Sequence, residues 1–243
     1  MKFPVEKQLK LSDDGRKGET MITRHQYRGC LKSDVTPERL MDALLEVRED
    51  VKAFIDGKKL LAVYLYRYKR MCFLYYEALE EGIGPNDFSG ALMPLLEMWP
   101  EEEGKTPWAL MYHIFHHSIP GEPEDWERER VGEKTKIGRI AFLYPDKIFS
   151  YTYWHKAIVD EGRHAGDKYQ CIALHENILF SYYEEPRTNV NLCGDKNAES
   201  KALAGWIAEN PESHFDREKA GGDNFLVIEP ILLADRRISR VNG

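Results

Sequence analysis

The sequence predicts an α+β fold made of two tandem ferredoxin-like (β-α-β-β-α-β) repeats. Two observations predict it: an internal repeat of hairpin, proline-terminated helix and strand, and a Pro- and charge-rich connector between the copies. One such sheet carries helices on one face only, so its other face needs a cover. We therefore expect the repeats to pack sheet against sheet as a pseudo-dimer within the chain, a dimeric α/β-barrel-like arrangement with the helices outside.

The internal repeat is clearest in two predicted hairpins, where FLYYEAL at 73–79 aligns with FSYYEEP at 180–186. After each hairpin an apolar-periodic stretch ends at a proline, which predicts a helix. One more strand-like run follows each helix. The aligned segments are 59–80 with 168–187, 91–103 with 202–214, and 108–118 with 224–236.

A strand and a helix precede each hairpin. The first helix, predicted over 37–57, places Leu40, Leu44, Val47 and Val51 at helical spacing. Its counterpart runs from about 149 to 162, and the preceding strands are expected over 20–32 and 137–145. The predicted boundaries are an N-terminal arm over 1–19, a first repeat over 20–119, a connector over 120–136 and a second repeat over 137–243.

Composition narrows the classes of function. The net charge of -7 and the absence of a basic stripe argue against nucleic-acid binding. The N-terminus has no apolar signal core and no apolar run is long enough to span a membrane, so we expect a cytoplasmic protein without membrane contact. Four widely spaced cysteines predict free thiols rather than disulfides or a metal site, with Cys72 and Cys171 buried in strands.

The residues that suggest chemistry lie in the helix of the second repeat. Pro145 and Asp146 suit a helix start. Tyr151 and His155 follow four residues apart and therefore share one helix face. A phenol and an imidazole side by side form a usable acid–base pair, because histidine titrates near neutral pH. The same spacing also occurs in helices where both groups are merely hydrogen-bonded.

The pattern around this pair resembles the L-rhamnose mutarotase family, which has Pro-Asp-x4-Tyr-x3-His-x2-Ile followed by a glycine-containing turn and a hairpin. The resemblance covers about 80 residues of the second half, and Asn210-Pro211-Glu212 is similar to that family's Asn-Pro-Asp. The matching residues here are Pro145, Asp146, Tyr151, His155 and Ile158, then Gly166, Ile172, Leu174, Leu179, Phe180, Tyr182, Tyr183 and Glu184.

The resemblance implies a dimeric α/β barrel that interconverts sugar anomers without a cofactor or metal. It implies that His155 and Tyr151 are catalytic. It further implies a small-molecule partner of the monosaccharide class, contacted by five residues. These implied substrate-binding residues are Gln170, Tyr169, Tyr182, Glu184 and Trp206.

The sequence also departs from the family. Glu199 and Ser200 stand where the family has a pair of tryptophans, and Trp206 lies two turns further on. Gln170 replaces a family tyrosine, with Tyr169 beside it. In the first repeat the positions of the pair are Ala43 and Val47, which cannot move protons. We therefore expect one active half and one degenerate half, in a monomer or weak homodimer.

Two other functions remain open: a dimeric α/β-barrel monooxygenase or haem-binding relative, and a non-catalytic small-molecule-binding protein. On the last strand of the first repeat, strand alternation places His113 and His117 on one face and His116 on the other. A strand end or cavity wall explains these histidines better than a metal site. No nucleotide-binding, zinc-protease or serine-hydrolase motif occurs.

Overall fold

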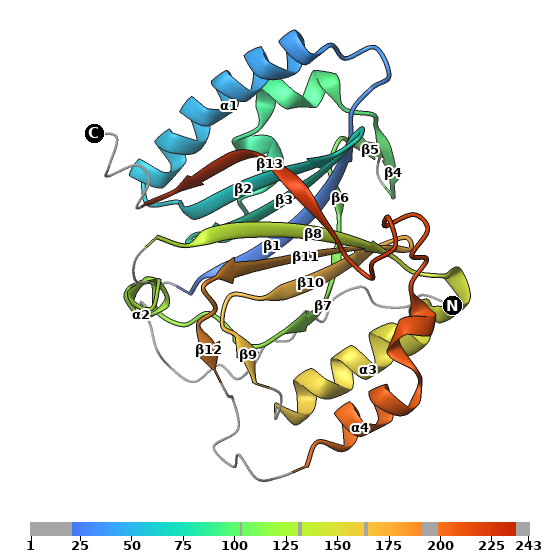
Figure 1. The fold of residues 1–243 in the computed structure, drawn as a ribbon. Helices are drawn as coiled ribbons and strands as arrows, with labels where there is room; N and C mark the ends of the chain where they lie inside the picture. The colour runs from blue at the N-terminus through green and yellow to red at the C-terminus, as the bar shows by residue number, and fades with distance from the viewer. Residues whose placement is uncertain (1–20, 103, 131–132, 163–164, 191–198, 237–243) are drawn as a thin grey trace.

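Each half of the chain supplies a β-α-β-β unit that one further strand completes (Figure 1). The computed structural model describes residues 21–102, 104–130, 133–162, 165–190 and 199–236. The first half contains β1 (Thr23–Cys30), α1 (Pro37–Asp56), β2 (Leu60–Tyr68), β3 (Met71–Ala78), two 3-10 helices (Pro85–Asp87 and Gly90–Leu95), β4 (Trp99–Glu101), β5 (Gly104–Thr106), β6 (Ala109–Leu110) and β7 (Tyr112–His116). The remainder contains α2 (Pro123–Arg128), β8 (Thr135–Phe142), a 3-10 helix (Pro145–Lys147), α3 (Ile148–Glu161), β9 (Gly166–Asp167), β10 (Cys171–His175), β11 (Ile178–Glu185), β12 (Asn189–Val190), α4 (Lys201–Ala208), a 3-10 helix (Pro211–His214) and β13 (Leu226–Asp235).

The last strand of each half passes from its own sheet to the other and so closes the barrel. Strand β13 pairs with β8 of its own half through residues 226–228 and with β2 of the first half through 229–235. In the same way, β6 pairs with β1 and its continuation β7 pairs with β10. The strand order is β6-β1-β3-β2-β13-β8-β11-β10-β7, and its two ends are consecutive segments of the chain. The predicted pseudo-dimer of two ferredoxin-like halves is confirmed.

The two long helices form where the sequence predicts them. At the start of α1 the Thr36 hydroxyl accepts the backbone N–H of Arg39, which caps the helix. Ala43 and Val47, which align with Tyr151 and His155 in the second repeat, are buried in the apolar core of the first half. Helix α3 ends at Gly162, whose φ of 64° is the left-handed conformation that favours glycine.

The core has one inner layer and two outer layers. Aromatic side chains of both halves fill the barrel interior: Tyr64, Tyr66, Phe73, Tyr75, Phe180 and Tyr182. Outside the barrel, α1 covers the first half's sheet, while α3 and α4 cover the second half's on the opposite side (Figure 1). Successive side chains of a strand point to opposite faces of the sheet, so they alternate between the barrel interior and the outer layer under the helices.

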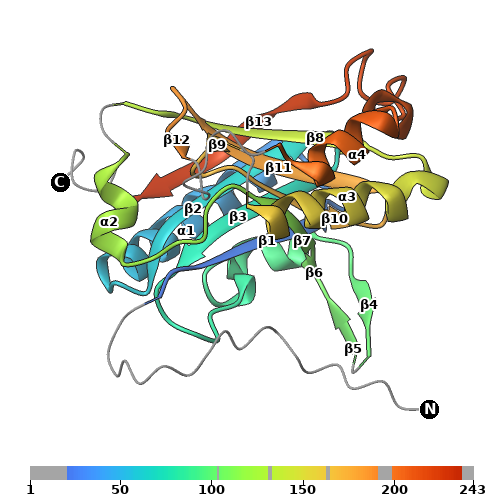
Figure 2. The ribbon, with the colours of Figure 1, turned by 90° about the horizontal axis from the view of Figure 1, so that it is seen from below.

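The second helix predicted for the first half is wrong. Instead of a helix over 91–103, the chain forms the 3-10 helix Gly90–Leu95 and then the β4–β5 hairpin, which projects from the barrel in Figure 2. Pro94 lies inside the 3-10 helix and Pro100 lies in β4. A proline lacks the N–H that an α-helix needs, so this apolar spacing could not become a continuous helix.

The segment between the repeats does more than connect them. Residues 123–128 form α2, which lies at one end of the barrel (Figure 1). Trp126 and Arg130 are buried, at 1% and 3% exposure. The connector was expected over 120–136 from its prolines and charges, but composition alone does not reveal that two of its side chains enter the barrel.

Two sequence predictions concern residues that the structure does not describe: the N-terminal arm over 1–19 and Cys193. Cys72 and Cys171 are free and buried, as predicted. None of the described helices combines the length and the apolar character needed to cross a membrane.

Candidate functional site

The structure divides the predicted site residues between two places. Tyr151, His155 and Trp206 lie together outside the barrel, between α3, α4 and the sheet. With His214 they form what we term the helix-face site. Tyr169, Tyr182 and Glu184 instead surround Arg130 at the barrel end, in what we term the barrel-end cluster. Gln170 is buried just before β10, and its backbone N–H donates to the carbonyl of Asp167.

In the helix-face site, the rings of Tyr151 and His155 are stacked, with centroids 3.8 Å apart and planes inclined by 18°. Nδ1 of His155 lies 2.8 Å from the Tyr151 carbonyl oxygen. A carbonyl can only accept a hydrogen bond, so Nδ1 carries the ring proton and donates it. In the neutral imidazole Nε2 is therefore the basic nitrogen. The helix thus sets the tautomer of its own candidate base.

Trp206 contacts every other ring of this site. Its centroid lies 5.4 Å from Tyr151, 5.0 Å from His155 and 4.7 Å from His214. The site is therefore mainly aromatic, with one phenol and two imidazoles among its walls.

Contacts between α3 and α4 place Trp206. The Glu161 carboxylate accepts hydrogen bonds from the Ser200 hydroxyl and the Ala202 backbone N–H, which ties the end of α3 to the start of α4. A Cβ on Gly205 would lie 2.2 Å from the Trp154 ring, so glycine permits the close approach of the two helices. A pocket of about 710 Å³ opens beside this contact; Ala157 and Ala202 are among its walls.

A half-buried cation, Arg139, neighbours the pair. Burial raises the pKa of the Tyr151 phenol, and the charge of Arg139 partly opposes that rise, so the phenol is protonated at neutral pH. The Arg139 guanidinium is held over the rings of Tyr183 and Phe225, at 4.8 and 4.3 Å, and donates to the Ser181 hydroxyl at 3.3 Å. The site therefore combines a base, a neutral acid and a positive charge suited to a developing anion.

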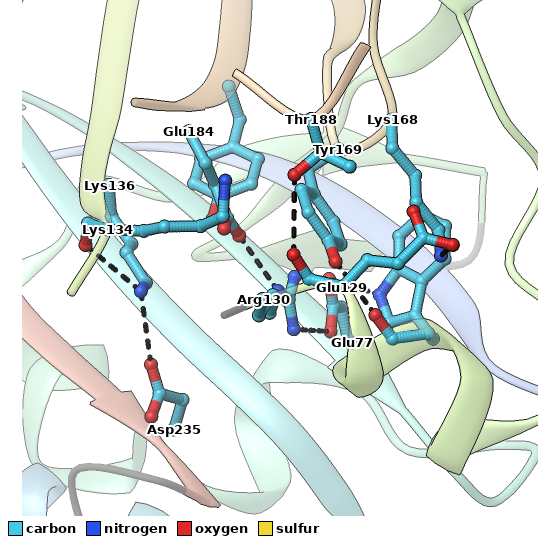
Figure 3. Close-up of polar contacts among 12 residues, drawn as sticks. Glu77, Glu129, Arg130, Lys134, Lys136, Lys168, Tyr169, Glu184, Thr188 and Asp235 are labelled. Atoms are coloured by element: carbon cyan, nitrogen blue, oxygen red, sulfur yellow. Dashed lines mark hydrogen bonds and ion pairs between the residues drawn. The ribbon is translucent and has the colours of Figure 1, made fainter. Parts of the chain in front are cut away.

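The barrel-end cluster is built around one guanidinium and two pseudo-symmetric carboxylates (Figure 3). Arg130 donates two hydrogen bonds to Glu77, of 2.5 and 2.9 Å, and one of 2.9 Å to Glu184. Each carboxylate also accepts, at 2.7 Å, from the tyrosine two residues before it, Tyr75 or Tyr182. These residues occupy matching positions in the aligned hairpins, so the connector's arginine joins the two repeats.

Glu77 is ionised although it is fully buried. Burial would raise the pKa of its carboxyl, but attraction to Arg130 and hydrogen bonds from Arg130, Tyr75 and Trp126 outweigh burial and lower it. Glu184 Oε2 has no hydrogen-bond partner in the described part of the chain. The other oxygen of Glu184 is already bonded to Arg130 and Tyr182, so the chemistry of this cluster favours holding the halves together. The expected role of Tyr169, Tyr182 and Glu184 in substrate binding stays a prediction.

The strand histidines are arranged differently from the prediction. A β-bulge interrupts the pairing of β7 with β10, since Ile172 pairs with Phe115 while Ala173 pairs with His113. The bulge breaks strict alternation, and His113 Nε2 and His116 Nδ1 come within 3.0 Å. Burial, followed by repulsion from Arg24, lowers the pKa of His116 to about 4. No group of three or more potential metal ligands occurs among the described residues.

A haem does not fit at His155, the histidine nearest the predicted acid. The imidazole is only 9% exposed. It is stacked on Tyr151, and the rings of Trp206 and Phe115 lie 5.0 and 5.5 Å from it. A macrocycle would need the space that these rings occupy.

Comparisons with known proteins identify no family: no family model matches, and no curated protein matches either. Solved structures with some likeness include a "putative monooxygenase" from Fusobacterium nucleatum (TM-score 0.40, 9% identity, 89% of this chain and 95% of that one). Another "putative monooxygenase", from Lactobacillus acidophilus, has a TM-score of 0.40 and 5% identity over 89% of this chain and 97% of its own. A "Putative Chlorite dismutase", TA0507, has a TM-score of 0.33 and 9% identity over 91% and 99%.

These TM-scores are too low to carry an argument about function, and the fold rests on the strand pairing itself. The resemblance to mutarotases gains no support from the comparisons.

Sequence reasoning did not identify His214, Arg139, Glu77 or Arg130. Glu77 could have been identified from the sequence, because it aligns with Glu184 in the hairpin repeat. His214 and Arg139 approach α3 only through tertiary contacts that no local pattern reveals.

Proposed function

We propose that the protein is a cofactor-free acid–base enzyme of the monooxygenase type, acting on a flat, enolisable aromatic molecule. The observation that carries the proposal is the hydrogen bond from His155 Nδ1 to the Tyr151 carbonyl, which makes Nε2 a defined base inside an aromatic site. Aromatic walls suit a flat apolar substrate of a few rings, which needs far less space than a haem and would reach these rings from the pocket beside the α3–α4 contact. A buried site strengthens the electrostatic effect of each polar group.

In the proposed reaction, His155 Nε2 takes a proton from a carbon next to the substrate's carbonyl group. The negative charge spreads to the oxygen, where the nearby cation Arg139 favours it. Tyr151 stays neutral and is available to return a proton. The substrate anion then reduces dioxygen: a C–O bond forms, and the resulting peroxide takes the proton held by His155. The second hydrogen of the same carbon leaves as a proton and the O–O bond breaks. One oxygen atom thereby becomes the carbonyl of the product and the other leaves as water, so the substrate itself supplies all four electrons.

Anthrone tests the proposal, because it is flat and its deprotonated form absorbs visible light. Anthrone and one dioxygen give anthraquinone and one water. We expect the purified protein to accelerate this conversion and His155→Ala to reduce the rate about 10²–10⁴-fold, the usual contribution of a general base. Tyr151→Phe should have a smaller effect, since its ring still fills the space. The control is His113→Ala, which removes an exposed imidazole on β7.

Anomer exchange in a monosaccharide is the second candidate. It is favoured by two polar groups of β8 and β11: Arg139, whose charge acts on Tyr151, and the Ser181 hydroxyl that accepts from Arg139. His155 would take the proton of the anomeric hydroxyl and an acid would protonate the ring oxygen. Saturation-transfer NMR across a sugar panel distinguishes the two: exchange that is lost in His155→Ala, without anthrone turnover, would replace the first proposal. Binding of either compound without reaction would indicate a non-catalytic binding protein.

A further inference from the structure

His214, in the helix-face site, is fully buried and has one ring nitrogen without a hydrogen-bond partner among the described residues. It ends the 3-10 helix Pro211–His214 and its exposure is 0%. Nε2 lies 3.0 Å from the Ser150 hydroxyl oxygen, whereas Nδ1 has no hydrogen-bond partner among the described residues. Leaving a buried polar nitrogen unpaired costs free energy, so native proteins contain few such groups and each calls for a reason.

The ring that carries the unpaired nitrogen lies near Tyr151 and packs on Trp206. The His214 ring is 4.7 Å from Trp206 and 6.3 Å from Tyr151, measured between centroids. Its partner Ser150 directly precedes Tyr151 on α3. A molecule bound in this aromatic site would therefore meet the imidazole of His214 as well as that of His155.

We infer that His214 is a substrate-binding residue that donates a hydrogen bond from Nδ1 to a carbonyl oxygen, which makes an aromatic ketone the substrate class. The inference rests on the proposed function and deepens it. The inference assigns the Ser150 hydroxyl as the donor to Nε2, so that Nδ1 carries the ring proton and needs an acceptor. A ketone oxygen meets that need, and it gains negative charge when His155 takes the proton from carbon, so the hydrogen bond strengthens as the reaction proceeds.

Two substitutions of His214 distinguish the role of Nδ1 from that of Nε2. In His214→Gln the longer amide reaches the position of Nε2 and can keep the bond to Ser150, but nothing replaces Nδ1. In His214→Asn the shorter amide reaches the position of Nδ1 and can still donate to the ligand. The probes are 9-fluorenone, a flat ketone without an enolisable hydrogen, and fluorene, which has nearly the same shape but no carbonyl group. Titration calorimetry measures both affinities without any reaction.

We expect the wild-type protein to bind fluorenone more tightly than fluorene by about five- to tenfold, the effect of one hydrogen bond. His214→Gln should remove this preference by weakening fluorenone alone, and His214→Asn should keep most of it. Equal affinities in the wild type, binding of neither probe, or an unchanged preference in His214→Gln would overturn the inference. Should His214→Gln fail to fold, the wild-type preference and His214→Asn still decide the question.

The two proposals can fail separately. A carbonyl preference that depends on His214, in a protein that does not convert anthrone, would uphold the binding role and refute the proposed reaction. Anthrone turnover that depends on His155 but is the same in His214→Gln would do the reverse.

Discussion

Replacing Arg130 tests whether the connector holds the two halves together. Arg130→Met keeps much of the side-chain volume but removes the guanidinium bonded to both Glu77 and Glu184, whose side chains are 0% exposed. Removing one partner of a buried ion pair typically costs about 3–5 kcal/mol, because the remaining charge stays buried. For a chain of this length the midpoint of thermal unfolding falls about 2–4 °C per kcal/mol, so we expect a decrease of roughly 6–20 °C.

The pH dependence should change sign in this variant. In the wild type the pKa of Glu77 is lowered on folding, so its contribution to stability is present above the unfolded-state pKa and is lost as the pH falls towards the folded-state value. Without Arg130, burial dominates and raises the pKa of this carboxyl. Raised carboxyl pKa values make the folded state less stable as pH rises, so Arg130→Met should be more stable near pH 5 than near pH 7.

Urea unfolding at both pH values measures these effects. The matched control is Arg128→Met, on the same connector, where the arginine side chain is 73% exposed and pairs with Asp125 at the surface. This control should leave the unfolding free energy close to that of the wild type. If the two variants unfold alike, or if Arg130→Met is stabilised as pH rises, Arg130 does not hold the halves as we describe.

Two further predictions concern packing and assembly. Gly205→Ala would place a Cβ 2.2 Å from the Trp154 ring, so we expect thermal unfolding to show a destabilisation of about 1–3 kcal/mol. The control is Gly121→Ala, which should have little effect because no described atom lies within 4 Å of its added Cβ. Equal effects of the two substitutions would contradict this packing. Because β13 and β7 close the barrel within one chain, light scattering should give the mass of a monomer or a weak dimer, and a mass showing that two chains complete one barrel would refute the intrachain closure.

The sequence carried enough information for the architecture but not for the polar partners. Hairpins 59–80 and 168–187 align because matching strands face the same layers, so one repeat predicts the other. That Tyr151 and His155 are neighbours on one face of α3 follows from helical spacing alone. The contact of His214 with Ser150 depends on residues 64 positions apart, and the turn that brings them together has no local signature.

The failed helix prediction has a different cause. Apolar spacing over 91–103 is consistent with a helix that ends at Pro100, yet the pattern does not weigh Pro94 inside the stretch, and the chain forms a short 3-10 helix and then a hairpin. The connector was expected to be a simple linker for a related reason, since prolines and acidic residues are typical of exposed linkers. Arg130 is one of several basic residues in this segment, and its local sequence does not distinguish it as the one that enters the barrel.

The exchange of the final strands means that neither half is a complete sheet on its own. A fragment ending after β7 would lose β13 and leave β2 as an open edge, and a fragment beginning at β8 would leave β10 open in the same way. Open edges present unpaired backbone donors and acceptors that recruit other chains. Proteolysis or truncation between the halves should therefore yield aggregation-prone pieces rather than two soluble domains, and during synthesis the first half remains unfinished until the last strand has been made.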